Sequence, residues 1–541
     1  MLTRRDVFSY SKKLVCVPLR LGGYCLDDSF TAETQRNAEI RRVEIRPAQI
    51  DIMIAKTSMR FVFVLVLVLS ASLQTSSAGP QNGGTIAWTP CELRGVPGSA
   101  KCGTFEVFEN RATRSGRKIG MNILVLPATG DKREADPLFY FAGGPGSGSS
   151  EDAPGIAQVF AKVREHRDLV FVDQRGTGKS HALDCTLYNP NDQQSYLGYF
   201  FPLEDVRKCR ADLETKADLT LYTTSIAMDD IDDVRAALGY DKINLFGGSY
   251  GTRAAMVYLR QHPKHVRTVM LQGVSPTNMY LPLDYPQQTE RALQGVLAEC
   301  VADEACNKAF PNLKSEAKAV LERLIKGPVA VEVRLQNSTT AKVSLSRDLA
   351  AEAIRYMLYN PVAATRIPLF LHLAAEGNFT PLTQAALNFR KVLVGTGSNG
   401  MYLTVTCAED LPWIKPGEGE RNAQNTFLGD YRLRQQREAC ALWPRAKVAS
   451  DYFKPVRSDL PVLILTGEWD PVTPPANGDF VARTMPNSLH IIVPHGAHGL
   501  GGLEGTECLD RLVTEFVERG TSKGLDTACV KNIRRRGFVL K

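Results

Sequence analysis

Three residues of this 541-residue chain have the types and the order needed for nucleophilic attack on a carbonyl group. Ser249 lies within Gly247-Gly-Ser-Tyr-Gly251, and Asp470 and His498 follow it along the chain. In a serine triad, the histidine takes the serine proton and returns it to the leaving group, while the carboxylate fixes the imidazole tautomer. The sequence therefore predicts Ser249 as nucleophile, His498 as base and Asp470 as the group that orients the base.

Each of the three residues follows a short apolar run typical of a buried strand, at residues 243–246, 462–466 and 490–493. The run before Ser249 leads into a helical pattern, which is the setting of a nucleophile elbow. In such an elbow the serine projects from a sharp turn. Gly247 and Gly251 leave out side chains that would collide with the strand and the helix.

A second glycine-rich turn indicates where a negatively charged oxygen would be stabilised. Gly143-Gly-Pro-Gly146 follows the apolar run at 138–142, and such a turn leaves backbone N–H groups free to face an oxyanion. We expect the N–H groups of Gly144 and of Tyr250, the residue after the nucleophile, to form the oxyanion hole.

A second histidine competes for the role of base. His495 lies in the same loop as His498, but His498 lies deeper in it. Gly496 and Gly499 flank His498 and leave room for the imidazole to move. We therefore favour His498.

Other carboxylates compete for the orienting role. Glu468 and Asp479 are close to Asp470 in sequence, but Asp470 stands at the transition from strand to loop. Asp173 also ends an apolar run, yet it precedes the nucleophile. We expect Asp173, together with Arg175, to fix loops near the site.

The wider pattern alternates apolar runs with helical stretches, which predicts an α/β fold with a mostly parallel sheet flanked by helices. A helix is expected at 229–238. Residues 105–108 are expected to pair with the strand at 119–127 in an antiparallel edge. The expected strands are at 119–127, 138–142, 169–173, 243–246, 269–272, 462–466 and 490–493. With the triad order, this pattern predicts the α/β-hydrolase fold.

The alternation lapses between about residues 275 and 455 and becomes mainly helical, with apolar stripes at 293–301 and 349–358. A small hairpin is expected from 329–335 and 342–345. We therefore expect a helical cap inserted into one α/β domain and placed over the active site. The predicted domain boundaries are core 79–275, cap 276–455 and core 456–541.

A secretory signal peptide is predicted at residues 59–78. Met59-Arg60 precedes an apolar run that is too short to span a bilayer, and Ser76 and Ala78 are the small residues expected before a cleavage site. Because signal peptides start at the initiator, we interpret 1–58 as a non-native upstream extension. The mature protein is then expected to begin at Gly79 and to be secreted or periplasmic, with no stable membrane anchor.

The cysteines agree with an exported protein, since the segment after residue 78 holds ten, an even number. They fall into neighbouring pairs, although sequence alone leaves the connectivity open. The pairs we expect are Cys91/Cys102, Cys185/Cys209, Cys300/Cys306, Cys407/Cys440 and Cys508/Cys529. No CxxC motif or Cys/His cluster has metal-ligand spacing, so we expect no metal and no cofactor.

The composition is that of a globular protein, with 44% hydrophobic and 23% charged residues. The net charge is +7, but residues 1–78 carry eleven Lys/Arg against seven Asp/Glu, so the remainder has a net charge of only +3. Nucleic acid is therefore not expected as a partner. The sequence does not indicate the oligomeric state.

The motifs together resemble the proline iminopeptidase and tripeptidyl aminopeptidase family of serine exopeptidases, over about residues 91–529. The resemblance is carried by Gly143-Gly-Pro-Gly, Asp173-Gln-Arg-Gly-x-Gly-x-Ser180, the Ser249 elbow and the Asp470/His498 tail. Proline iminopeptidases usually have a histidine before Gly-Gly-Pro-Gly, where this chain has Ala142. This departure argues against strict proline iminopeptidase activity more than against the family.

The resemblance implies an exported aminopeptidase that releases short N-terminal units from peptides through an acyl-enzyme. Such an enzyme needs a counter-charge for the substrate ammonium, and Glu409 and Asp410, late in the insertion, are the candidates. A solvated acidic pair is the alternative for these two residues. The alternative activities are a carboxylic ester hydrolase on the same scaffold and a non-catalytic binding protein with this fold.

Overall fold

The computed structural model describes residues 84–335 and 339–541. The predicted upstream extension at 1–58 and the predicted signal peptide at 59–78 lie outside these residues. Among the described residues, no helix combines the length and the apolar character that a membrane span requires.

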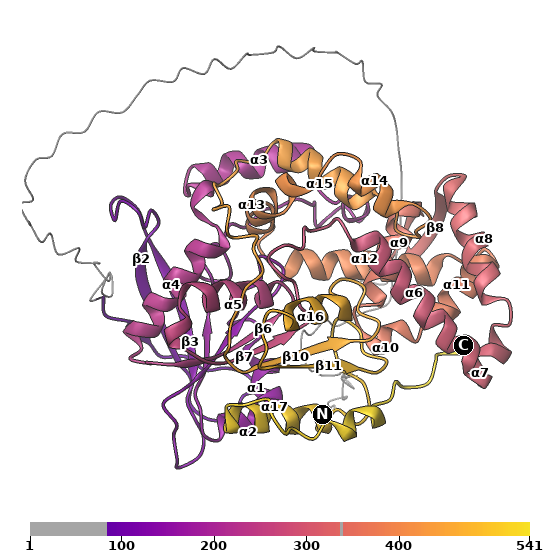
Figure 1. Cartoon of the computed structure of the whole chain (residues 1–541). Coiled ribbons are helices and arrows are strands. Elements are labelled where there is room, and N and C mark those ends of the chain that lie inside the picture. Colours follow the sequence, from indigo (N-terminus) through magenta and orange to yellow (C-terminus); the bar gives the residue numbers. More distant parts are fainter. Residues whose placement is uncertain (1–83, 336–338) are drawn as a thin grey trace, which may run out of the picture. The chain divides into compact units, whose positions relative to one another are not determined.

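One nine-stranded sheet organises the described part of the chain, in the order β1-β2-β3-β5-β4-β6-β7-β10-β11 (Figure 1). Its strands are β1 Ala87–Thr89, β2 Lys101–Phe108, β3 Lys118–Leu126, β4 Leu138–Phe141, β5 Leu169–Val172, β6 Ile243–Gly248, β7 Val266–Gln272, β10 Val462–Gly467 and β11 Ser488–Val493. Pairing is antiparallel from β1 to β5 across the first edge and parallel from β5 to β11. All seven predicted strands and the predicted antiparallel edge are present.

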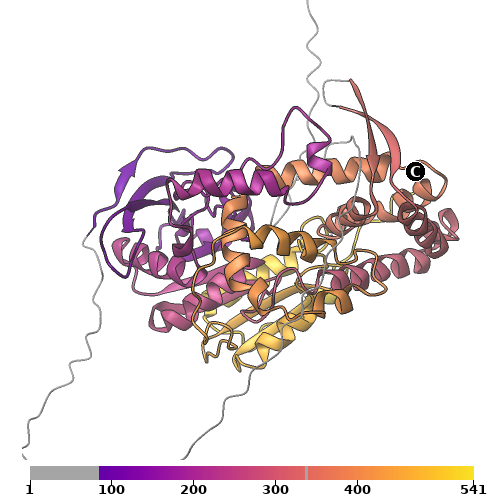
Figure 2. The same ribbon diagram turned by 90° about the horizontal axis from the view of Figure 1, so that it is seen from above.

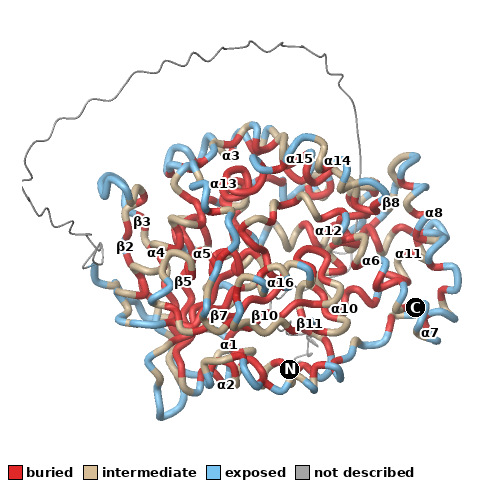
Figure 3. The backbone as a smooth tube through the Cα atoms, in the orientation of Figure 1, coloured by how far each residue is buried: buried red, intermediate tan, exposed pale blue. Residues whose placement is uncertain are grey.

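The parallel strands are short and apolar because both faces of the sheet are covered. β5 reads Leu-Val-Phe-Val and is buried throughout, as is β10. Figure 3 shows these central strands as buried.

Helices on the two faces complete a three-layer arrangement. On one face, α4 Thr224–Ala237, α5 Tyr250–Gln261 and α16 Pro475–Ala482 share an apolar core with the sheet. On the other face, α1 Ala153–Val159, α2 Ala161–Arg164 and α17 Glu507–Arg519 do the same. The helix predicted at 229–238 is α4, which begins earlier, after a cap in which the Thr223 side chain accepts from the Ile226 N–H.

A long, mainly helical insertion separates β7 from β10, although these two strands are hydrogen-bonded neighbours. Its helices are α6 Tyr285–Ala302, α7 Glu304–Ala309, α8 Leu313–Ile325, α9 Arg347–Met357, α10 Pro361–Ala364, α11 Ile367–Ala375, α12 Thr380–Gly395, α13 Asn399–Glu409, α14 Glu418–Ala423 and α15 Tyr431–Ala441. The predicted hairpin is present as β8 Val329–Arg334 and β9 Thr340–Leu345, and Figure 2 shows it projecting from these helices.

The helices of the insertion pack in one hydrophobic cluster that also includes residues outside the insertion, among them those of α3 Leu203–Glu214 and Tyr250 of α5. The domain boundaries at 276 and 455 stay a prediction. Short 3-10 helices complete the elements, at Ser195–Leu197, Leu219–Leu221, Pro263–His265, Leu411–Trp413 and Ala528–Asn532.

Five disulfides join the ten described cysteines in the predicted order. Two of them tie helices of the insertion together, since Cys300–Cys306 links α6 to α7 and Cys407–Cys440 links α13 to α15. The others are Cys91–Cys102, Cys185–Cys209 and Cys508–Cys529.

Candidate active site

Ser249 occupies a strained turn between β6 and α5. Its φ of 56° and ψ of −125° lie in a backbone region that residues other than glycine rarely adopt. A Cβ on Gly247 would lie 2.3 Å from the Gly251 carbonyl oxygen, and one on Gly251 would lie 1.9 Å from that of Phe141. Both glycines are therefore required by close backbone approach, as the elbow interpretation predicted.

Asp470 and His498 are joined directly at the ends of β10 and β11. The His498 Nδ1 lies 2.8 Å from Oδ2 of Asp470. The loop after β10 holds Asp470 in place, because the N–H groups of Val472 and Thr473 each donate to its Oδ1 at 2.8 Å. The Thr473 hydroxyl donates to Oδ2 at 2.7 Å and lies 3.0 Å from His498 Nδ1.

These contacts keep Asp470 ionised although it is fully buried. Burial alone raises the pKa of a carboxyl, but His498 and the donors on Thr473 outweigh it and lower the pKa of Asp470 below its ordinary value. A charged Asp470 accepts from Nδ1–H of His498, which leaves Nε2 as the basic nitrogen.

Ser249 and His498 lie on either side of the end of β7. The Ser249 N–H donates to the Gln272 carbonyl at 2.9 Å. A Cβ on the next residue, Gly273, would lie 3.2 Å from Cε1 of His498. Among the described residues, the hydrogen bonds of the His498 ring go to Asp470 and Thr473 and not to the Ser249 hydroxyl. Catalytic hydrogen bonds often tighten only when substrate binds.

The glycine-rich turn after β4 lies against the nucleophile. A Cβ on Gly143 would lie 3.2 Å from the Ser249 Cβ and 3.7 Å from its Oγ. The next residue, Gly144, has a φ of 110°, which favours glycine. Tyr250 is the first residue of α5, where backbone N–H groups lack partners within the helix. The assignment of the Gly144 and Tyr250 N–H groups to an oxyanion hole stays a prediction.

The competing histidine has another partner. His495 Nδ1 lies 2.6 Å from Glu299 of α6, and the His495 N–H donates to Glu468 at 2.9 Å. These three residues could present metal-ligating atoms within 4.8 Å of one another. However, Glu299 also accepts from Trp469 at 2.8 Å and from Arg535 at 2.9 Å, so its oxygens already have donors.

The competing carboxylates are also engaged elsewhere. Glu468 accepts from the His495 N–H. Asp479 lies 2.9 Å from Nδ1 of His490. Asp173 is buried and accepts from the N–H groups of Ser150 and Lys179, so it fixes loops as predicted.

Arg175 is held in the same region as Asp173. Its guanidinium binds Asp230 of α4 and donates to the carbonyls of Glu109 and Leu221. This agrees with the predicted role in fixing loops.

Glu409 and Asp410 lie at the end of α13 and are fully buried. Glu409 accepts from the Thr224 N–H and hydroxyl at 2.7 Å each and from the Tyr452 hydroxyl. Asp410 Oδ1 accepts from Arg253 at 2.8 Å, whereas its Oδ2 has no hydrogen-bond partner among the described residues. They are not a solvated surface pair, and their role in binding an ammonium group stays a prediction.

Burial also dominates the charge state of Asp410. It raises the pKa of this carboxyl to about 6, even though the adjacent Arg253 acts in the opposite direction. The charge of Asp410 therefore changes within an accessible range of pH.

The sequence reasoning missed one residue of the insertion that contacts the predicted base. The Tyr359 ring meets the His498 ring edge to face, with centroids 4.9 Å apart, and its carbonyl accepts from the Gly499 N–H at 2.8 Å. No local pattern singles out Tyr359, because it reaches His498 only through the packing of the insertion on the sheet.

A family model described as alpha/beta hydrolase fold matches residues 136–501. The chain belongs to the α/β-hydrolase fold family, in agreement with the sheet order and the helical layers.

Three curated relatives show which members of that family the chain is similar to. Serine protease Hip1 of Mycobacterium tuberculosis is 27% identical over 489 residues, covering 84% of this chain and 92% of that protein. Tripeptidyl aminopeptidase of Streptomyces lividans is 24% identical over 484 residues, covering 83% and 88%. Proline iminopeptidase of Neisseria gonorrhoeae is 29% identical over 140 residues, covering 26% of this chain and 32% of that protein.

These similarities confirm the resemblance drawn from the motifs. They also confirm that the chain is an enzyme, a serine hydrolase of the peptidase class. Over most of its length the chain aligns with Hip1 and tripeptidyl aminopeptidase, whereas the similarity to proline iminopeptidase is confined to a shorter region.

Proposed function

We propose that this peptidase is a serine aminopeptidase that releases short N-terminal units from peptides through an acyl-enzyme. The observation that carries the proposal is the Asp470–His498 hydrogen bond at the strand ends, beside the elbow that presents Ser249. His498 takes the Ser249 proton as Oγ attacks the scissile carbonyl, and then donates that proton to the leaving amine. Water, deprotonated by His498, releases the N-terminal unit from Ser249.

The N–H groups of Gly144 and Tyr250 would bind the oxygen that becomes negative in both tetrahedral intermediates. Donors fixed in advance lower the barrier because they need no reorganisation as the charge develops. The position of Gly143 against the Ser249 Cβ supports this role for the turn that follows β4.

The preference for a free N-terminus rests on the insertion and its acidic pair. A substrate ammonium needs a counter-charge, and Asp410 retains an oxygen without a hydrogen-bond partner, while both oxygens of Glu409 have donors. We assign the direct contact to Asp410, with Glu409 beside it. The name of the Streptomyces relative, tripeptidyl aminopeptidase, supports the release of a short N-terminal unit.

Export is the second part of the proposal, with the protein secreted or periplasmic. The sequence at 59–78 has the pattern of a signal peptide, and the five disulfides favour an oxidising compartment. N-terminal sequencing of the exported protein should give Gly79 as its first residue.

The decisive test is a panel of matched peptides with free or acetylated N-termini, together with simple esters. We expect the purified protein to cleave free peptides and to lose about ten- to a hundredfold in kcat/KM on acetylated ones, because a charged contact is lost. Ser249→Ala, prepared in the same way, is the control for contaminating peptidases. Equal cleavage of both peptide forms would refute the aminopeptidase assignment, and turnover of esters alone would favour an ester hydrolase.

A further inference from the structure

Two buried arginines of the insertion share a single carboxylate. Arg355 of α9 and Arg432 of α15 are 0% and 3% exposed, and Glu352, which is 1% exposed, lies between them. Arg355 Nη1 lies 3.4 Å and Arg432 Nε lies 3.8 Å from the same oxygen, Oε1 of Glu352. The other oxygen of Glu352 accepts from the Tyr431 hydroxyl. This group therefore carries an excess positive charge in the interior.

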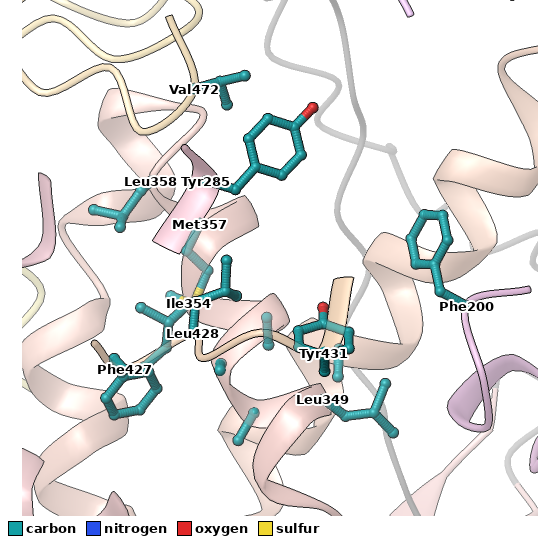
Figure 4. Packing of buried hydrophobic residues seen from close by; sticks show 14 of the residues in the cluster. Phe200, Tyr285, Leu349, Ile354, Met357, Leu358, Phe427, Leu428, Tyr431 and Val472 are labelled. Carbon is teal, nitrogen blue, oxygen red and sulfur yellow. The ribbon is translucent and has the colours of Figure 1, made fainter. Parts of the chain in front are cut away.

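Aromatic rings cover the faces of both guanidinium groups. The Arg432 guanidinium lies 3.3 Å from the Phe200 ring centroid, and that of Arg355 lies 3.9 Å from the Tyr285 centroid. Figure 4 shows Phe200, Tyr285 and Tyr431 among the buried hydrophobic residues that the insertion packs together. An aromatic ring stacked on a guanidinium group stabilises its positive charge. The ring does not accept hydrogen bonds from the N–H groups, which lie in the plane of the guanidinium.

Several of these N–H donors have no hydrogen-bond partner among the described residues. They are Nε of Arg355, Nε and Nη1 of Arg432, and Nε2 of Gln436, one turn after Arg432. Arg432 and Gln436 also converge on the Tyr402 hydroxyl, at 3.4 and 3.2 Å. Buried donors without acceptors are costly and rare, so a concentration of them around one cationic group indicates an absent acceptor.

The cationic group is connected to the candidate active site. Arg355 Nη2 donates to the Tyr359 hydroxyl at 2.7 Å, and the Tyr359 ring contacts His498. The Tyr402 hydroxyl accepts from Arg432 at 3.4 Å, and burial raises the pKa of this hydroxyl. The cationic group is thus connected to the predicted base through one residue, Tyr359.

We propose that Arg355 and Arg432 form a subsite that binds a carboxylate of the peptide substrate. This inference rests on the proposed aminopeptidase function and adds a preference to it. The ligand is a carboxylate because it brings the missing negative charge and accepts from several guanidinium N–H groups at once. The carboxylate is either an acidic side chain within the N-terminal unit or the C-terminus of a short peptide, and the two sources can be separated by experiment.

The test uses free-N-terminus peptides of one length in three sets. The first set carries Glu, Gln or Leu at each of the first three positions in turn, with an amidated C-terminus. The second compares a free with an amidated C-terminus on a neutral peptide. The third adds glutarate alone to the Ser249→Ala protein and follows its melting temperature. Each set is repeated with Arg432→Gln, Arg432→Lys and, as a matched control on the exposed side of α15, Arg434→Gln.

We expect the wild-type protein to prefer one carboxylate peptide over its Gln or amide counterpart by about ten- to a hundredfold in kcat/KM. Arg432→Gln should abolish the preference and the glutarate stabilisation. Arg432→Lys should retain part of both, and Arg434→Gln all of both. A preference in the first set identifies an acidic side chain, and one in the second set identifies the C-terminus.

The proposal is overturned if the wild-type protein shows no preference in either set, or if the preference survives in Arg432→Gln. Should Arg432→Gln fail to fold, as judged by circular dichroism, Arg355→Lys and Arg432→Lys with the glutarate series decide the question. Failure of the proposed function is distinguishable, because it would appear as absent fluorophosphonate labelling of Ser249 or as equal cleavage of acetylated peptides. Those results do not depend on the carboxylate series.

Discussion

The sheet and the insertion each hold a buried carboxylate near the candidate site, and the two are held in opposite ways. Asp470 follows β10, where two backbone N–H groups, Thr473 and His498 donate to it and lower its pKa. Asp410 directly follows α13, and burial raises its pKa to about 6 although Arg253 acts in the opposite direction.

The difference shows that the position of each carboxylate in the fold determines its charge state and therefore its role. The loop at the strand end supplies donors that lower the pKa of Asp470, which favours the charged carboxylate that orients a base. Asp410 has fewer donors, and its main counter-charge is the adjacent Arg253, which does not outweigh the effect of burial on its pKa. The sheet side should therefore determine whether any substrate reacts, and the insertion should determine which substrate does.

The largest effect should come from the nucleophile. Ser249→Ala should lower kcat by about a millionfold on every substrate, because triad members act as a unit. Loss of covalent labelling by a fluorophosphonate, with an unchanged melting curve, is the measurement. Hydrolysis near the wild-type rate would refute the mechanism.

Replacing the base should have a comparably large effect. His498→Ala should lower kcat nearly as much as Ser249→Ala, while His495→Ala serves as a matched control from the same loop, with its ring on Glu299. Steady-state kinetics of the two variants side by side distinguish the roles. The opposite ranking would transfer the role of base to His495.

Asp470→Asn tests the sheet side of the comparison. The amide cannot favour the required imidazole tautomer, and kcat should fall by about ten-thousandfold for amino-free peptides, acetylated peptides and esters alike. A loss confined to one substrate class, measured with all three, would contradict the general role of Asp470.

Asp410→Asn tests the insertion side and should be smaller and selective. We expect about a ten- to hundredfold loss in kcat/KM on amino-free peptides and little change on esters. In the wild type, Asp410 is neutral below pH of about 6 and charged above it, so the amino-free to acetylated ratio of kcat/KM should rise as pH increases through that value. Glu409→Gln should act in the same direction.

The ratio is the informative quantity because it cancels groups that both substrates use. The ratio should be measured between pH 5 and 7.5, a range that spans the Asp410 pKa of about 6. A ratio that does not change over this range would place the ammonium contact elsewhere in the insertion. Comparison of Asp410→Asn with the wild type at each pH is the control.

The smallest effect should come from Tyr359, which links the two sides. Tyr359→Leu removes the ring that meets His498 and the hydroxyl that accepts from Arg355, and should lower kcat several-fold through looser placement of the base. Tyr359→Phe keeps the ring and should retain most of the activity. If both variants lose activity equally, the hydroxyl and not the ring is responsible.

Strands and turn glycines were largely predictable because their patterns are local. The runs before Ser249, Asp470 and His498 are apolar and short, which is how strands buried on both faces read. β1 was missed because Ala87–Thr89 is only three residues long and exposed. α4 was predicted too short, because its first turns depend on the Thr223 cap and not on apolar periodicity.

The sequence by itself determined the elbow motif and the order of the three triad candidates, and it predicted the insertion between two parts of the sheet, since each follows from near neighbours or from spacing along one chain. It left the connectivity of the cysteines open, and the five disulfides are a finding of the tertiary structure. Only the tertiary structure decided that Tyr359 meets His498, that Asp410 pairs with Arg253, and that Arg355 and Arg432 share Glu352. Apart from the Arg355–Glu352 pair within α9, these contacts join segments far apart in sequence. Their geometry is set by how the helices of the insertion pack, and no local pattern encodes that packing.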